Sequence, residues 1–138
     1  MKITRKATAN WKGKVKDGKG TLTTGSHVLK DTNYSFNTRF EDGVGTNPEE
    51  LVAAAHAGCF TMQLSALLSE EDHLPNHLNT EAKLDFEEGS IQKIHLDLTG
   101  DVDNIDEETF LEIAQKAKRI CPISKLLNTE IVLNTQLS

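Results

Sequence analysis

Proline and glycine are scarce in this chain of 138 residues, which has three prolines and nine glycines. So few of either residue excludes a collagen-like or low-complexity chain. A composition of 37% hydrophobic and 26% charged residues also excludes a strongly disordered one. Because a domain usually has about 150 residues, we expect a single domain that spans residues 1–138.

An excess of positive charge is also absent, since 21 Asp and Glu residues outnumber 15 Lys and Arg residues and give a formal net charge of −6. This balance argues against a nucleic-acid-binding surface, which must neutralise phosphates. The most apolar stretch, residues 51–68, is interrupted by His56, Gln63 and Ser65, and the start of the chain is polar. We therefore expect a soluble cytoplasmic protein without a membrane span or an export signal.

The chain has only two cysteines, Cys59 and Cys121. Their spacing leaves open a structural disulfide, two buried inert thiols, zinc ligands or a redox pair. A structural disulfide is disfavoured because the cytosol is reducing. Two buried thiols without a chemical role are the default interpretation.

The order of predicted elements is typical of an α+β fold. Glycines punctuate short strands in the first forty residues, and two alternating segments surround a turn at residues 88–90. Asp106 is placed to cap an amphipathic helix, and Pro122 ends or restarts that helical run. The predicted strands cover Tyr34–Phe40, Ala82–Phe86, Ile94–Leu98 and Ile131–Leu137.

The clearest helix start in the sequence is at Asn47, Pro48 and Glu49. Asn suits the N-cap, Pro suits the first helical position, and the positive end of the helix dipole favours carboxylates in the first turn. These signals predict a helix from Pro48 to Ser69. Because this segment has almost no polar face, we expect the helix to be buried on most sides.

The two cysteines differ in the positive potential that neighbouring residues in the sequence would provide to a thiolate. A thiolate needs positive potential, and Cys121 would lie at the N-cap of a turn opened by Pro122, near Lys118 and Arg119. Local rules therefore choose Cys121 as the more acidic thiol. A reactive Cys59 would need a cation from a distant segment, and Arg39 on the predicted strand is the best placed, although most such arginines are simply solvated.

A carboxylate could orient Arg39 through paired hydrogen bonds. At 100° per residue, Glu50 lies on the opposite side of the helix from Cys59, whereas Glu49 lies about 80° away. Glu49 is thus the better partner for Arg39, and Glu50 suits a capping box with Asn47. Since ten helical residues rise about 15 Å, either Arg39 bridges that gap or a dimer interface completes the site, and we favour the interface.

Four sequence blocks occur in the order Asn37-Thr38-Arg39-Phe40, Gly45-Thr46-Asn47-Pro48-Glu49-Glu50-Leu51, Ala53-Ala54-Ala55-His56-Ala57-Gly58-Cys59-Phe60 and Cys121-Pro122-Ile123-Ser124. Together they closely resemble the OsmC/Ohr family of thiol peroxidases, and the likeness covers nearly the whole chain. The Thr-Arg-Phe and Glu-Glu-Leu blocks, with His56, look more like the OsmC (osmotically inducible protein C) branch than the organic-hydroperoxide-resistance branch.

The resemblance implies an intertwined α+β homodimer, with antiparallel sheets around a buried central helix and active sites at the subunit interface. It implies reduction of organic hydroperoxides, and more weakly of hydrogen peroxide, to alcohol and water, with no cofactor and no metal. Cys59 matches the peroxidatic cysteine, Cys121 the resolving cysteine, and Arg39 and Glu49 the residues that hold the thiolate. A dithiol, for example a dihydrolipoyl protein, would reopen the resulting disulfide.

Two other functions remain as alternatives. His56 and Cys59 share a helical face and could form one edge of a metal-binding module with Cys121, although no second closely spaced ligand pair exists. Alternatively, the chain is a dimer of the same fold without peroxidase activity, in which both thiols pack in the core. Phe36, Phe60 and Met62 could line a pocket for an organic tail, but core packing is the more common role of such residues.

Overall fold

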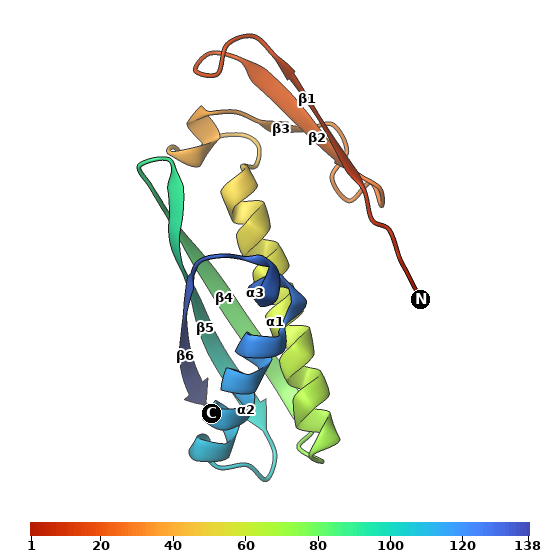
Figure 1. Cartoon of the computed structure of the whole chain (residues 1–138), viewed down its shortest axis with the longest axis vertical. Helices are drawn as coiled ribbons and strands as arrows, with labels where there is room; N and C mark the ends of the chain where they lie inside the picture. The colour runs from red at the N-terminus through yellow and green to blue at the C-terminus, as the bar shows by residue number, and fades with distance from the viewer. The chain divides into compact units, whose positions relative to one another are not determined.

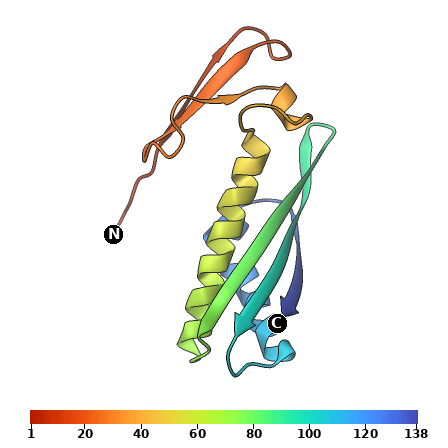
Figure 2. The same cartoon turned by 180° about the vertical axis from the view of Figure 1, so that it is seen from behind.

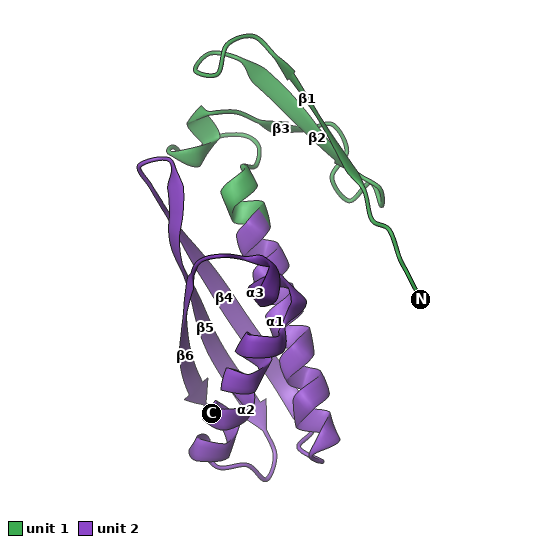
Figure 3. Cartoon of the chain, viewed as in Figure 1, with its two compact units in different colours: residues 1–51 green, residues 52–138 purple.

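The computed structural model describes all residues from Met1 to Ser138. The chain divides into two compact units, unit 1 with residues 1–51 and unit 2 with residues 52–138, coloured separately in Figure 3. The α1 helix, Pro48–Glu70, begins in unit 1 and continues through unit 2.

Unit 1 is a small sheet with almost no core of its own. The β1 (Ala7–Lys12), β2 (Lys19–Thr24) and β3 (Thr32–Tyr34) strands pair antiparallel in that order. The rings of Trp11 and Tyr34 lie 5.4 Å apart, and a Cβ atom at Gly20 would collide with both. Only Gly20 and Thr46 are buried in this unit, so most of its sheet surface is exposed in the single chain.

The predicted strand from Tyr34 to Phe40 is wrong beyond its first residue. The β3 strand ends at Tyr34, and the single turn of 3₁₀ helix η1 covers Asn37–Arg39. Ser35 and Thr38 exchange hydrogen bonds that close this turn: the Thr38 amide donates to the Ser35 hydroxyl, and the Ser35 amide donates to the Thr38 hydroxyl. Such side-chain bonds offer the backbone an alternative to a sheet ladder. The alternation of aromatic and polar residues was therefore misleading.

Unit 2 is a sheet covered on one face by helices. The strands β4 (Pro75–Glu87), β5 (Ser90–Val102) and β6 (Glu130–Leu137) form it in the order β4-β5-β6. Figures 1 and 2 show that α1, α2 (Glu107–Ile120) and α3 (Pro122–Leu126) all lie on the same face. The opposite face carries polar and charged side chains, such as the Lys83–Asp97 ion pair of 3.0 Å.

The hydrophobic core of the chain lies entirely in unit 2. Alternate residues of β5 are buried, which is the period of a strand with one face against a core. They pack with one face of α1 and with the apolar stripe of α2. The most deeply buried large side chains include Phe60, Leu64, Leu68, Ile94, Leu96, Leu98 and Phe110.

The sequence predicted several of these elements correctly. The α1 helix begins at Pro48, and the Asn47 side chain accepts a hydrogen bond of 2.7 Å from the Glu50 amide, as expected for an N-cap. Asp106 caps α2 in the same way, through the Thr109 amide. The turn between β4 and β5 falls at residues 88–89. The α+β class is confirmed, although β6 pairs parallel with β5 in place of the expected antiparallel arrangement.

The prediction that α1 is buried on most sides is wrong for the single chain. Its buried residues are His56, Phe60, Leu64, Leu67 and Leu68, which form one face. Ala54, Gly58 and Ala66 are exposed, and Met62 is 72% exposed. By length and composition α1 could cross a membrane, a test that the core helix of a globular protein also passes. No element of unit 2 covers the face of α1 that carries these exposed residues.

Candidate active site

One group of candidate residues lies in unit 1, where Arg39 and Glu49 form an ion pair. The Nε atom of Arg39 lies 3.0 Å from one carboxylate oxygen of Glu49 and 3.2 Å from the other. Both groups are partly shielded, with 32% of the Arg39 side chain and 15% of the Glu49 side chain exposed. The predicted choice of Glu49 as the partner of Arg39 agrees with this contact.

Side chains around the start of α1 hold this pair in place. The side-chain amide of Asn47 donates a hydrogen bond of 3.0 Å to the Thr38 backbone carbonyl, and the Thr38 hydroxyl donates one of 2.8 Å to the Thr46 carbonyl. These bonds tie η1, which carries Arg39, to the first turn of α1, which carries Glu49. Glu50 accepts a hydrogen bond of 2.6 Å from the Thr46 hydroxyl. Glu50 thus has a structural role beside the cap, but its carboxylate accepts from Thr46 in place of the Asn47 backbone amide that a capping box would use.

A hollow in unit 1 lies beside Arg39. Its walls are mainly apolar and aromatic, which suits an organic group next to a cation. Of the residues proposed for such a pocket, Phe36 lines this hollow, whereas Phe60 is a fully buried core residue and Met62 lies on the exposed face of α1. The lining residues are Trp11, Val15, Tyr34, Ser35, Phe36, Arg39 and Pro48.

A second group of candidate residues lies in unit 2, where Cys59 and Cys121 are neighbours. Both thiols are free, and Cys121 is one of the groups that influence the Cys59 thiol directly. Cys121 is completely buried, whereas Cys59 is partly exposed. The α1 helix positions Cys59, and the junction between α2 and α3 positions Cys121. The α1 helix and the α2–α3 junction therefore bring the two thiols together.

The local surroundings keep Cys59 protonated. Burial raises the pKa of the Cys59 thiol above its ordinary value, and the neighbouring Cys121 thiol raises it further. The Ile123 amide donates a hydrogen bond to the Cys59 sulfur and acts in the opposite direction, lowering that pKa. Because the raising effects dominate, unit 2 by itself does not provide a thiolate at neutral pH.

The local rule that favoured Cys121 predicted the start of α3 correctly, but an amide of its first turn acts on Cys59. Cys121 is the N-cap of α3 and Pro122 the first helical residue, yet the Cys121 side chain makes no capping bond. The next free amide of that first turn, from Ile123, points to Cys59. This partner was missed because residues 59 and 123 are remote in sequence.

His56 takes part in a different contact from the one that a metal module needs. Its Nε2 atom lies 2.8 Å from the Ser124 hydroxyl, and both residues are buried. No group of three or more His, Cys, Asp or Glu side chains is arranged to hold a metal ion. Ser124 was also missed, although its spacing from Cys121 matches the spacing of His56 from Cys59.

The fold and these contacts define a class of protein: an α+β protein with two neighbouring free cysteines. The OsmC-like protein family model matches residues 40–136. Peroxiredoxin OsmC of Escherichia coli is 47% identical over 141 residues, which cover 99% of each chain. The organic hydroperoxide resistance protein OhrB of Bacillus subtilis is 28% identical and covers 86% of this chain and 88% of its own length.

Solved structures give the same result. The crystal structure of Bacillus subtilis OhrB has a TM-score of 0.71 at 28% identity and covers 97% of this chain and 98% of that one. The OsmC-like protein from Mycoplasma pneumoniae, at 15% identity, has a TM-score of 0.76 and covers 99% of both chains, which shows the shared fold. This chain belongs to the OsmC family, so the resemblance of the four sequence blocks is confirmed.

Proposed function

We propose that Cys59 is the peroxidatic cysteine and Cys121 the resolving cysteine of this chain. The chain is a thiol peroxidase that reduces organic hydroperoxides, in agreement with the peroxiredoxin that is 47% identical over its full length. The observation that carries the assignment is the contact between a partly exposed Cys59 and a fully buried Cys121. A hydroperoxide can reach the exposed sulfur, and the buried thiol is ready to react with the product.

The reaction has three balanced steps. The Cys59 thiolate attacks the distal peroxide oxygen, so an S–O bond forms while the O–O bond breaks, and the alkoxide takes up a proton to leave as alcohol. The Cys121 thiol then attacks the sulfenic sulfur of Cys59, and the hydroxide leaves with the Cys121 proton as water. Finally, an external dithiol reduces the disulfide and is itself oxidised.

The difference in exposure between Cys59 and Cys121 indicates which sulfur of the disulfide the external thiol attacks. The external thiol attacks Cys59, because Cys121 has no exposed surface, and Cys121 leaves as the thiol. A dithiol suits this step since its second thiol resolves the mixed disulfide. We propose a dihydrolipoyl protein as the physiological donor and the cytoplasm as the location, because the cycle needs reduced thiols.

We also propose that Arg39 of a second copy converts the Cys59 thiol into a thiolate, with Glu49 orienting that arginine. A guanidinium within a few ångströms favours the charged form of a thiol, which the surroundings in unit 2 disfavour. The Arg39–Glu49 pair already has the geometry of a held cation. The same two groups would polarise the peroxide as charge develops on its oxygen.

Two unsatisfied surfaces support the homodimer that this mechanism needs. Unit 1 buries only Gly20 and Thr46, so its sheet of three strands lacks an apolar core. A sheet of this size needs such a core, or a helix packed against it, to be stable. The exposed face of α1 presents Ala54, Gly58 and Met62 to solvent. A second copy would cover both surfaces, and the two units would then act as one OsmC-like domain over residues 1–138.

The test is the consumption of cumene hydroperoxide with dihydrolipoamide as the reductant. We expect Cys59→Ser to lower turnover by more than about 1000-fold. Cys121→Ser should react once and then accumulate sulfinic acid at Cys59, which mass spectrometry of the peptide detects. Turnover of Cys59→Ser at the wild-type rate would contradict the assignment.

A further inference from the structure

A buried hydrogen bond in unit 2 joins α1 to α3 across a sequence separation of 68 residues. The His56 Nε2 atom and the Ser124 Oγ atom are 2.8 Å apart. His56 is fully buried and Ser124 is 9% exposed. The proposed chemistry does not use either residue, yet a buried polar pair of this kind is costly to leave unpaired. The contact therefore needs an explanation.

The position of the pair in the chain indicates its role. His56 precedes Cys59 by three residues, which is about one helical turn, and Ser124 follows Cys121 by three residues. The hydrogen bond therefore connects the same two segments as the contact between the thiols. Ser124 is also the only buried residue of the five-residue helix α3. Removing its hydroxyl takes away the polar anchor of this short helix.

The chemistry of the pair makes it a fixed contact. Burial lowers the pKa of His56, so the imidazole is neutral at physiological pH and carries one proton. The Nδ1 atom is buried and has no hydrogen-bond partner. A proton on Nε2, donated to the Ser124 oxygen, leaves no buried N–H group without an acceptor, and we assign this tautomer. The bond then holds Ser124 in one orientation.

We propose that His56 and Ser124 are positioning residues that hold Cys121 and the Ile123 amide against Cys59, and so set the rate at which the sulfenic acid becomes a disulfide. This inference rests on the proposed roles of the two cysteines. In the resolving step the Cys121 sulfur must approach the Cys59 sulfur in line with the breaking S–O bond. A misplacement of about 1 Å can slow such a step about 100-fold.

The experiment separates the two oxidation steps in a single turnover. Reduced protein is mixed with one equivalent of cumene hydroperoxide and quenched at short times. Mass spectrometry then measures thiol, dimedone-trapped sulfenic acid, disulfide and sulfinic acid at Cys59. For Ser124→Ala, we expect Cys59 oxidation within about threefold of wild type. Disulfide formation should be about 10 to 100 times slower, with more sulfinic acid.

Three further variants exclude a general loss of structure. Ser124→Thr keeps the hydroxyl and should restore the disulfide rate. The double variant His56→Leu/Ser124→Ala removes both polar partners and should recover stability relative to Ser124→Ala, while disulfide formation remains slow. Thr80→Val is the matched control, since it removes the hydrogen bond of 2.7 Å from Thr61 that ties α1 to β4 and does not involve α3.

Several results would overturn the inference. A wild-type disulfide rate in both Ser124→Ala and the double variant would show that the pair does not position Cys121. The same slowing in Thr80→Val would show that any loosening of α1 has this effect. A wild-type protein whose Cys59 remains a thiol after peroxide would instead refute the proposed function, and the first phase of the experiment reports that separately.

Discussion

The two units of this chain differ in what they can do alone. Unit 2 holds every buried hydrophobic side chain and both cysteines, whereas unit 1 holds the Arg39–Glu49 pair and buries only Gly20 and Thr46. In unit 2 the Cys59 pKa is raised, so the sulfur lacks the charge that it needs to react. The nucleophile and the activating cation that we propose therefore belong to different units.

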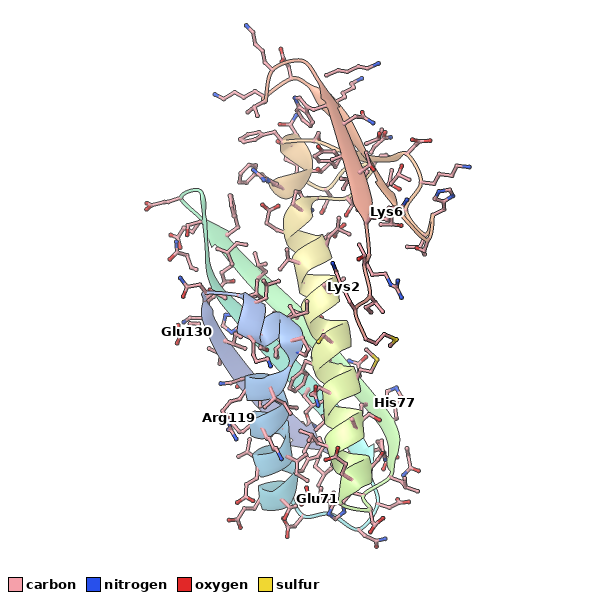
Figure 4. All side chains as sticks on the ribbon, turned by 45° about the vertical axis from the view of Figure 1, so that its right-hand side comes forward. Lys2, Lys6, Glu71, His77, Arg119 and Glu130 are labelled. Atoms are coloured by element: carbon pink, nitrogen blue, oxygen red, sulfur yellow. The ribbon has the colours of Figure 1, made fainter.

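The two units also differ in net charge. Unit 1 contains nine Lys and Arg residues against six Asp and Glu residues, while unit 2 contains six against fifteen. In Figure 4, the labelled Lys2 and Lys6 belong to the basic N-terminal segment, and Glu71 and Glu130 belong to the acidic unit. Opposite net charges favour association of unit 1 of one copy with unit 2 of another. This agrees with the homodimer that we propose.

The largest effect that we expect concerns the core. Leu64 is fully buried in unit 2, so Leu64→Ala should lower the free energy of unfolding by about 2–5 kcal/mol. Val28 in unit 1 is 82% exposed, so Val28→Ala should change the free energy of unfolding by less than about 0.5 kcal/mol. Urea denaturation measures both. Equal losses of the free energy of unfolding in the two variants would show that both units contribute equally to the core.

The next effect concerns the cation. Arg39→Ala should lower peroxidase turnover at pH 7 by about 10- to 100-fold, because an oriented charge at the reacting atoms is lost. It should also raise the pKa of Cys59 further, so the thiolate absorbance at 240 nm would appear at higher pH and activity would recover as the pH increases.

Two controls accompany this variant. Arg39→Lys keeps the charge but loses the planar guanidinium, so its activity should lie between those of wild type and Arg39→Ala. Arg5→Ala removes another cation of unit 1 and should leave the titration of Cys59 unchanged. If Arg39→Ala also leaves that titration unchanged, another group activates the sulfur.

A smaller effect separates the two carboxylates at the start of α1. Glu49→Gln should lower turnover about tenfold or less, because Arg39 loses a charged partner that is partly shielded from solvent. Glu50→Gln should have almost no effect on turnover, since an amide oxygen still accepts the hydrogen bond from Thr46. The same hydroperoxide assay compares them, and a larger loss in Glu50→Gln would reverse the two assignments.

Local signals in the sequence predicted the elements that depend on neighbours in the chain. Asn47 and Pro48 fixed the start of α1, and Asp106 fixed the start of α2, because capping involves residues within one turn. The segment from Tyr34 to Phe40 alternates like a strand, but contacts of Ser35, Thr38 and Asn47 convert it to a 3₁₀ turn. Such contacts are not encoded in the alternation.

The site was predictable only in part for the same reason. The choice of Glu49 over Glu50 followed from helix geometry, and the structure pairs Glu49 with Arg39. The Ile123 amide and the Ser124 hydroxyl reach α1 from more than sixty residues away, so no local rule could place them. The equal spacings of His56 from Cys59 and of Ser124 from Cys121 were the one available signal.

The measurement that most directly tests activation of one copy's sulfur by another copy's arginine combines two variants that each have strongly reduced activity. Cys59→Ser and Arg39→Ala chains are unfolded together, refolded as a mixture and assayed with cumene hydroperoxide. Half of the resulting dimers would be mixed, and each would contain one complete site, so we predict recovery of about a quarter of wild-type activity. A mixture no more active than its separately refolded components would contradict this account.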